Sequence, residues 1–171
     1  MTSVGSESLD ILTLGVDASP RRIGWAIQHA GRILAYDTWH VDRDEDIRSR
    51  REAWRTIRDH IRTAERATNR DLNIIGIEDA YLGPNRKGSL NLARTIGHVE
   101  AFAHVAFPYA LQHRVPNATW RRALGLGATG KLPALGAARA VLEDETLADQ
   151  DAADAICISL AVAYLYSEAE E

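Results

Sequence analysis

The 171-residue sequence contains a single cysteine, Cys157, so an intramolecular disulfide is excluded. This thiol falls within an apolar helical pattern, which predicts a small core residue in a reducing compartment. No uninterrupted run of about 18 apolar residues occurs, and no membrane span is expected. Residues 1–10 lack the basic and apolar blocks of a secretion signal and are expected to form a disordered tail. We therefore expect a cytoplasmic protein, located in the host cytoplasm if it is viral.

Positive charge is absent from the last part of the sequence. Residues 143–171 contain nine acids and no Lys or Arg, whereas residues 79–142 contain eight basic residues against two acids, a net charge of +6. The overall charge of −4 therefore conceals a basic middle region. Such a region can bind a polyanion such as nucleic acid. Solvated surface arginines are the alternative, since 18 of the 20 basic residues are Arg.

The hydrophobic pattern predicts a mixed α/β fold. Apolar runs rich in β-branched residues predict five strands, at residues 11–18, 23–30, 32–41, 72–80 and 109–115. Helical periodicity predicts helices at residues 44–68, 89–106, 118–125, 133–143 and 150–167, with Asn117 as the cap of the third. The first three strands form an antiparallel meander, whereas the helix before the fourth strand allows that strand to lie parallel to the first. The result is a mixed sheet covered by helices, in a single domain over residues 11–167.

Four carboxylates interrupt these apolar segments. Asp17 falls within the first strand, and Glu78 lies near the end of the fourth. Because both strands are expected to be central and parallel, both side chains should emerge near the same edge of the sheet. Asp151 and Asp154 stand three residues apart, on one face of the last helix near its start. Carboxylates within apolar segments are costly unless they are paired or bind a metal ion.

Some of these acids also have an ordinary structural alternative. Asp17 could hydrogen-bond within a turn that contains Ser19, and Asp149 or Asp151 could cap the last helix, where an acid suits the helix dipole. Asp149, the first of the three acids, is expected to be the cap. Asp154 lies in the second turn of an apolar helix, where no capping role exists.

The predicted ligands are all oxygen donors, and no set of His or Cys residues accompanies them. Hard oxygen ligands favour Mg²⁺ or Mn²⁺ over zinc. Two such ions in one site can activate a water molecule and stabilise the leaving oxygen in phosphodiester hydrolysis. The acids at the start of the last helix are therefore predicted metal ligands, and its apolar remainder is predicted to fasten the helix to the sheet.

Five segments, in this order along the chain, resemble the RuvC family of Holliday junction resolvases, within the RNase H-like superfamily. They are GVDASPRRIGWAI, IIGIEDAY, GSLNLARTIGHVEAF, GLGATGK and DAADAICISLAVA. The last is the most specific, because that family closes its active site with an Asp-Ala-Ala-Asp helix. The resemblance covers about residues 11–166. It implies an RNase H-like α/β fold, in which a mixed sheet of three antiparallel and two parallel strands is flanked by helices.

The resemblance also implies an activity, the metal-dependent cleavage of four-way DNA junctions by paired symmetric nicks in DNA recombination and repair. The residues that match the family's catalytic carboxylates, which hold two Mg²⁺ or Mn²⁺ ions, are Asp17, Glu78, Asp151 and Asp154. Lys131, at the end of a glycine-containing loop, resembles a lysine that assists at the scissile phosphate. Tyr81 matches an aromatic position that contacts DNA near the junction. A solvated loop lysine and a loop aromatic packed on the domain are the alternatives for these two residues.

The basic middle region supplies the remaining DNA-binding candidates, which are Arg86, Lys87, Arg114, Arg121 and Arg122. After the fifth strand the family often has a lysine, whereas this chain has Pro116 and Asn117. Arg121 and Arg122 are candidates to replace its phosphate contacts, and the family's junction-sequence preference is not carried over. The helix at residues 89–106 resembles the family's dimer helix, so a homodimer is expected.

Three other functions share parts of the pattern. An ATPase of the actin or sugar-kinase type begins with a similar strand, but it needs a second domain and a second phosphate-binding hairpin. A non-catalytic RNase H-like DNA-binding module would lack one of the four acids, and all four are present. A nuclease of the same fold that cuts flaps, forks or other branched DNA is not separated from a strict resolvase by the sequence.

Overall fold

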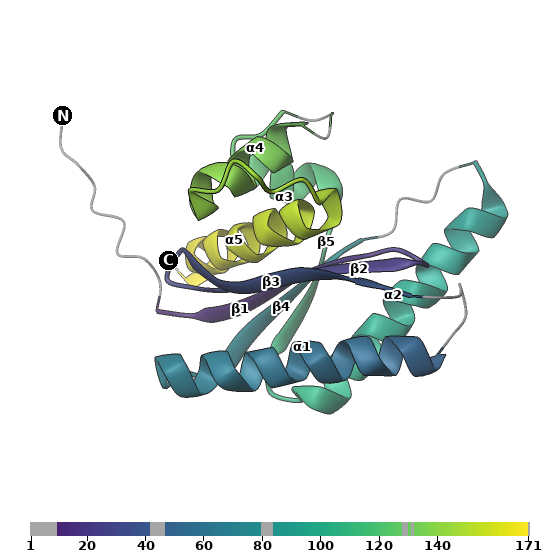
Figure 1. Cartoon of the computed structure of the whole chain (residues 1–171), viewed down its shortest axis with the longest axis horizontal. Coiled ribbons are helices and arrows are strands. Elements are labelled where there is room, and N and C mark those ends of the chain that lie inside the picture. The colour runs from purple at the N-terminus through teal and green to yellow at the C-terminus, as the bar shows by residue number, and fades with distance from the viewer. Residues whose placement is uncertain (1–9, 42–46, 80–83, 128–129, 131, 171) are drawn as a thin grey trace.

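A mixed five-stranded sheet lies between two layers of helices (Figure 1). The computed structural model describes residues 10–41, 47–79, 84–127, 130 and 132–170. The strands are β1 (Leu12–Ala18), β2 (Arg22–His29), β3 (Arg32–His40), β4 (Leu72–Glu78) and β5 (Leu111–Val115). They lie in the order β3-β2-β1-β4-β5; the β1–β2 and β2–β3 pairs are antiparallel, and the β1–β4 and β4–β5 pairs are parallel. The sheet predicted from the sequence is therefore confirmed.

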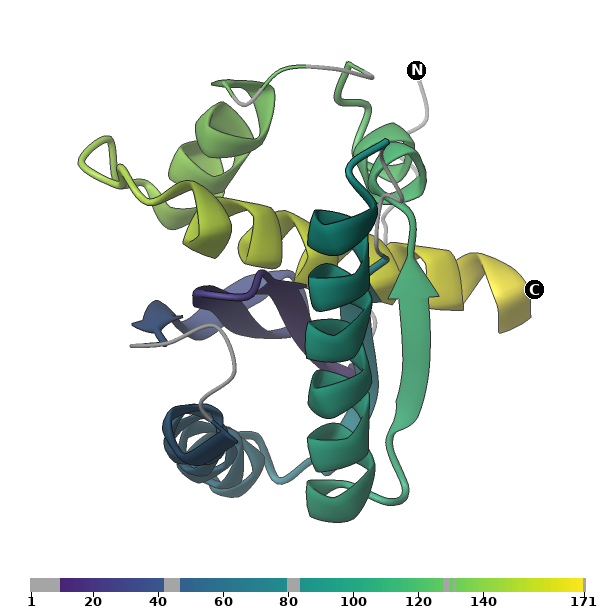
Figure 2. The same ribbon diagram turned by 90° about the vertical axis from the view of Figure 1, so that its right-hand side faces the viewer.

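Two helices cover one face of the sheet and three cover the other. The helices are α1 (Ile47–Thr68), α2 (Arg86–Ala106), α3 (Asn117–Ala123), α4 (Leu132–Leu142) and α5 (Gln150–Glu170). In Figure 1, α1 runs below the sheet, and α3, α4 and α5 lie above it. Figure 2 shows α2 alongside β5, on the same side of the sheet as α1. No helix in the described ranges is long and apolar enough to cross a bilayer.

The structure differs from the sequence predictions at the starts of α2 and α3 and at Asp10. Helix α2 begins three residues earlier than expected, because the Asn85 side chain accepts a hydrogen bond from the Gly88 N–H at 3.1 Å and caps the helix. Asn117 does not cap α3, contrary to the prediction, and is instead its first residue. Asp10, assigned to the disordered tail, contacts Arg70 and His29. The rest of that tail and the expected helix start at residue 44 lie outside the described residues.

Alternation along β1 divides its side chains between the two faces of the sheet. Leu12, Leu14 and Val16 are fully buried against α1 and α2, in a core that includes Ile57 and Ile96. The residues between them face α5. Period-two alternation in a strand covered on both faces explains this division.

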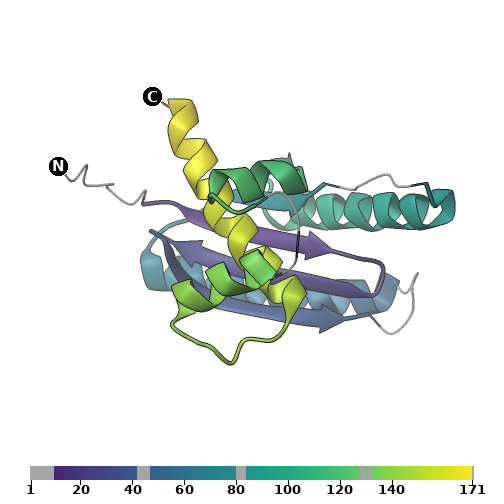
Figure 3. The ribbon, with the colours of Figure 1, turned by 90° about the horizontal axis from the view of Figure 1, so that it is seen from above.

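Helix α5 lies against the strands because glycines leave room for it. A Cβ at Gly15 would lie 2.2 Å from the Ala155 carbonyl oxygen, and one at Gly24 would lie 2.2 Å from that of Asp151. Gly76, which pairs with Gly15 across β1 and β4, would bring a Cβ within 2.5 Å of the Val162 side chain. Figure 3 shows α5 crossing the sheet obliquely over these strands. Because these three residues have no side chains, the helix can pack directly against the backbone of the strands.

The Gly15→Ala substitution is predicted to destabilise the protein by about 3 kcal/mol, because the new methyl group meets helix backbone rather than a side chain that can move. Gly136→Ala is the matched control, since nothing lies within 4 Å of a Cβ built at that position in α4. It should stabilise the protein by about 0.5–1 kcal/mol through the higher helix propensity of alanine. Urea denaturation followed by circular dichroism measures both. Equal stabilities for the two variants would contradict the close approach.

Candidate active site

The strand acids reach the same edge of the sheet, as predicted. Asp17 is the next-to-last residue of β1, and Glu78 is the last residue of β4. The two strands are parallel neighbours in which Val16 pairs with Ile77, so the two acids follow directly after paired positions. Both side chains lie on the α5 face, since Asp17 follows Gly15 by two residues and Glu78 follows Gly76 by two.

The helix acids are brought to this edge by the first turns of α5. Gly24 of β2 pairs with Asp17 across the sheet and also contacts the backbone of Asp151. Asp154 lies one turn further along the helix. The charges of Glu78, Asp154 and Asp151 all act on Asp17. Three elements far apart in the sequence therefore bring the four predicted acids into one cluster.

Asp17 is the most strongly perturbed of these acids. Its burial raises the pKa of the carboxyl group well above its usual range. The charge of Glu78 and a hydrogen-bonding contact with that carboxyl group raise it further, followed by the charges of Asp154 and Asp151. Desolvation and like charges both disfavour ionisation, so in the absence of a cation Asp17 holds its proton more tightly than an exposed aspartate.

Asp154 is perturbed in the same direction. Burial raises its pKa to about 6, a hydrogen bond from the Gln150 side chain at 2.9 Å opposes this effect, and the charge of Glu78 adds to it. The charge of Arg121 lowers the pKa and that of Asp151 raises it. Burial is therefore the main reason why this carboxyl group ionises less readily than an exposed aspartate.

Glu78 is held by two neutral donors from α3, which the sequence analysis did not identify. Asn117 donates its side-chain N–H to Oε1 of Glu78 at 2.6 Å, and the indole N–H of Trp120 donates to the same oxygen at 3.1 Å. Trp120 is fully buried and fixes this contact. The sequence did contain a clue, since the segment ATWRRAL follows the fifth strand directly. Its pairing with Glu78 depends on the parallel β4–β5 register, which brings Val115 beside Glu78.

Asp149 caps α5, as predicted. Its Oδ1 accepts a hydrogen bond from the Ala152 N–H at 3.0 Å and another from the Thr38 hydroxyl at 2.8 Å. Burial acts to raise the pKa of Asp149, but these hydrogen bonds and the charge of Arg22 outweigh it, and the pKa is lowered. Asp149 is therefore anchored at the helix start, outside the group of four acids.

A cation site at the cluster would suit hard metal ions. All four acids offer oxygen donors, the ligand type that Mg²⁺ and Mn²⁺ prefer. Burial, and to a lesser degree neighbouring carboxylates, raise the pKa values of Asp17 and Asp154, and a bound divalent cation would favour their ionised forms. Within the described ranges, however, no three acidic, His or Cys side chains already lie close enough to surround one ion. The fit to a metal ion is therefore one of donor chemistry and location.

A cleft of about 410 Å³ opens beside the strand acids. Asp17, Ser19, Glu78 and Asp79 line it on the side of the sheet, and Leu92 and Ile96 line it from α2. The cleft gives a substrate access to Asp17 and Glu78.

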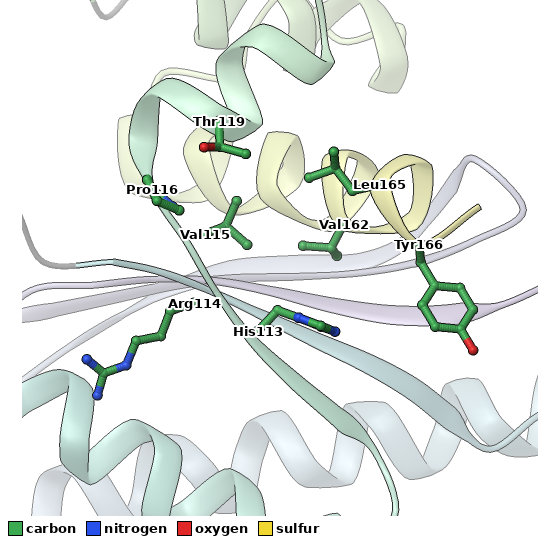
Figure 4. Close-up of a pocket in the computed structure, with 8 residues that line it drawn as sticks. All are labelled: His113, Arg114, Val115, Pro116, Thr119, Val162, Leu165 and Tyr166. Atoms are coloured by element: carbon green, nitrogen blue, oxygen red, sulfur yellow. The ribbon is translucent and has the colours of Figure 1, made fainter. Parts of the chain in front are cut away.

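A second hollow, of about 230 Å³, lies along β5 between α3 and the later turns of α5 (Figure 4). Part of its wall is apolar and is formed by Val115, Val162 and Leu165. It contains none of the four acids, and the cleft is therefore the candidate reaction site.

The predicted DNA-binding residues lie in different environments. Arg86 and Lys87 are exposed in the first turn of α2, and Arg122 is exposed on α3. Arg114 is exposed on β5, but Glu100 accepts two hydrogen bonds from its guanidinium, at 2.5 and 2.6 Å. This pairing lowers the pKa of Glu100 and raises that of Arg114.

Arg121 has a different environment from the other arginines. It is 4% exposed and donates hydrogen bonds to the carbonyl oxygens of Gly127 at 2.9 Å and Gly130 at 2.6 Å. These buried contacts with the backbone of Gly127 and Gly130 favour a structural role for Arg121 over the predicted phosphate contact. Tyr81 and Lys131 themselves lie outside the described residues.

The fold has counterparts among solved structures, although no protein-family model and no curated protein matches the sequence. A Thermus thermophilus RuvC in complex with Holliday junction substrate is 14% identical and has a TM-score of 0.69, over 92% of this chain and 96% of that chain. A second Thermus thermophilus RuvC structure is 15% identical with a TM-score of 0.68, over 93% and 97% of the two chains. At these identities the likeness establishes the fold alone, and the fold is that of the two RuvC structures.

The raised pKa of Asp154 predicts how metal-free stability depends on pH. Folding favours the protonated carboxyl, so Asp154 lowers stability as pH rises from its unfolded pKa of 3.8 toward about 6. The Asp154→Asn variant cannot ionise and can still accept the Gln150 hydrogen bond. In EDTA at pH 7.5, its Tm should exceed that of the wild type by at least about 3 °C, and this difference should vanish below pH 4.

Asp71→Asn, at an exposed position, is the control for loss of one negative charge. Its Tm should differ little from that of the wild type across the same pH range. A lower Tm for Asp154→Asn than for the wild type at pH 7.5 would contradict the assigned pKa shift. Thermal melts in matched buffers decide the result.

Proposed function

We propose that this chain is a metal-dependent endonuclease that cuts branched DNA and that its principal substrate is the four-way junction. The observation that carries the proposal is the convergence of Asp17, Glu78, Asp151 and Asp154 at one edge of a RuvC-like sheet. One of the compared RuvC structures is a complex with Holliday junction substrate. The same substrate class suits a chain of this fold whose acids occupy one edge and whose exposed basic residues include Arg86, Lys87 and Arg122.

The four acids have distinct parts in the proposed reaction. Asp17 and Glu78 would hold the ions from the strands, and Asp151 and Asp154 would hold them from α5. When bound, two Mg²⁺ or Mn²⁺ ions supply an activated water and stabilise the leaving oxygen. Asn117 and Trp120 keep the Glu78 carboxylate in place through its Oε1. Because its pKa is raised well above the usual range, Asp17 would release a proton on binding a cation.

DNA contacts are proposed for Tyr81 and for the predicted basic residues other than Arg121, whose guanidinium is buried and bonded to backbone carbonyls. Arg86 and Lys87 project from the first turn of α2, the helix that supplies Leu92 and Ile96 to the cleft wall. Arg122 is exposed on α3, next to the helix residues that hold Glu78. Lys131 is proposed to assist at the scissile phosphate. Arg114, paired with Glu100, would need to exchange that partner for a phosphate.

The Asp17→Asn variant tests the reaction. We expect its cleavage of a mobile four-way junction in Mg²⁺ to fall at least about 1,000-fold, because a carboxamide is a poor ligand for a hard cation and the metal ions contribute several kcal/mol. Junction binding in a gel-shift assay should persist, since no DNA-contacting cation is removed. A flap and a linear duplex, assayed in parallel, distinguish junction selectivity from broader branched-DNA cleavage.

Asp59→Asn, an exposed change on α1, is the matched control and should cleave like the wild type. Full cleavage in EDTA, or by Asp17→Asn, would refute the metal-dependent mechanism. Equal cleavage of the junction and the flap would support the proposed nuclease activity but contradict its selectivity for the junction. The substrate class would then be branched DNA in general.

A homodimer is proposed to set two sites for paired nicks, because opposed strands of a four-way junction are related by an approximate two-fold axis. Helix α2 has the required two faces. Ile96 and Val99 are buried against the sheet, whereas Leu90, Ala93 and Ala101 are exposed on a neighbouring face. These exposed residues and Gly97, with nothing within 4 Å of its Cβ position, would permit close approach of a partner helix.

Sedimentation at micromolar concentration tests the dimer. The wild type should sediment as a dimer, and Gly97→Glu should sediment as a monomer, because a charged side chain would occupy the proposed helix contact. Gly136→Glu is the matched control, since it adds the same charge where a Cβ also has open space, and it should remain dimeric. A monomeric wild type that still nicks both strands in one binding event would contradict this arrangement.

A further inference from the structure

Arg22 lies beside the acid cluster because a tight turn fixes its backbone. The Ser19 N–H donates to the Arg22 carbonyl oxygen at 2.8 Å, and the Arg22 N–H donates to the Ser19 hydroxyl oxygen at 3.0 Å. Arg22 is the first residue of β2, and Gly24, two residues later, contacts Asp151. The turn therefore places the Arg22 side chain at the start of α5.

The guanidinium of Arg22 contacts two carboxylates with different roles. One terminal nitrogen contacts Asp149, the cap of α5, and Nε lies 2.7 Å from Oδ2 of Asp151. Asp149 is itself fixed by Thr38 and by the Ala152 N–H. The Asp151 side chain is only 23% exposed, so solvent screens this contact incompletely. A positive charge thus occupies one oxygen of a proposed metal ligand.

The backbone position of Asp151 does not depend on Arg22. The Gly24 backbone meets the Asp151 carbonyl and Cβ, and the Asp149 cap fixes the helix start. Removal of the guanidinium therefore leaves the Asp151 carboxylate near the cluster. The contribution of Arg22 to the site is its charge and its occupation of Oδ2.

We infer that Arg22 competes with the divalent cation for Asp151. In the metal-free protein Asp149 and Asp151 share the single positive charge of the guanidinium. When a cation binds, Asp151 exchanges Arg22 for the metal, and Arg22 keeps its contact with Asp149. Arg22 thereby weakens metal binding while it stabilises the metal-free site. This inference rests on the proposed function, because it assigns Asp151 to the metal.

Substitution of Arg22 and substitution of its partner Asp149 are predicted to change the metal affinity in opposite directions. The Arg22→Gln variant loses the competing charge, and its Mn²⁺ affinity should rise roughly fivefold, since a unit charge a few ångströms away has a substantial effect at a partly shielded site. The Asp149→Asn variant keeps a capping oxygen for the Ala152 N–H but loses the charge that draws Arg22 aside. Arg22 then pairs with Asp151 alone, and the affinity should fall about threefold.

Isothermal titration of the full chain with Mn²⁺ measures these affinities without DNA. Arg22→Lys keeps the charge but has one nitrogen in place of the two that reach Asp149 and Asp151, so its Mn²⁺ affinity should lie between those of the wild type and Arg22→Gln. Arg21→Gln removes a positive charge from the neighbouring exposed position and serves as the matched control for long-range electrostatics. The double variant Arg22→Gln/Asp149→Asn should bind more tightly than Asp149→Asn alone, because the competitor is gone.

Thermal stability gives a second measurement that does not depend on activity. In EDTA, Arg22→Gln should melt below the wild type, because Asp149 and Asp151 lose their cation, and added Mn²⁺ should raise its Tm by more than that of the wild type. An Mn²⁺ affinity of Arg22→Gln equal to or weaker than that of Arg21→Gln would overturn the inference. So would tighter binding by Asp149→Asn. Absence of Mn²⁺ binding by the wild type would instead refute the proposed metal site itself.

Discussion

Helix α5 crosses β2, β1 and β4 with its backbone or side chains against Gly24, Gly15 and Gly76, and this contact sets the distance between the helix acids and the strand acids. A side chain at Gly15 would push the helix outward, and Asp151 and Asp154 would move away from Asp17 with it. The buried hydrogen bond from the Thr13 hydroxyl to the Ser159 carbonyl, at 2.9 Å, fixes the helix along its axis. The geometry of the acid cluster is therefore a consequence of packing between one helix and three strands.

This packing has an electrostatic cost. Burial and like charge raise the pKa values of Asp17 and Asp154, so the site is under repulsion when no cation is present. The apolar remainder of α5 offsets that cost, because Ile156, Ile158 and their neighbours are fully buried against the sheet and α4. Burial of each such side chain contributes about 1.5–3 kcal/mol. The hydrophobic run after the acids is what allows a chain to keep repelling carboxylates at one edge.

The sequence predicted those features of the site that depend on pattern. Alternating and helical periodicity located every element within a few residues, and the placement of Asp17 and Glu78 after apolar runs predicted their convergence. Features that depend on tertiary contact were missed. Asn117 follows a proline before a helix and has the local pattern of a cap, yet its side chain donates to Glu78 across the β4–β5 pair. Arg121 and Arg122 are adjacent and identical in type, and only the fold buries the first and exposes the second.

The acids of the cluster have different kinds of partner. Glu78 receives neutral donors, and both of these bonds use Oε1, so they fix the carboxylate without adding a positive charge and without using Oε2. Asp151 instead contacts a full cation, Arg22, and the charge of Arg121 acts on Asp154. Neutral donors orient a ligand at little cost to its affinity for metal, whereas a cation must be displaced or outcompeted. Glu78 is therefore oriented by neutral donors, Asp154 has both a neutral donor in Gln150 and the charge of Arg121, and Asp151 contacts a cation directly.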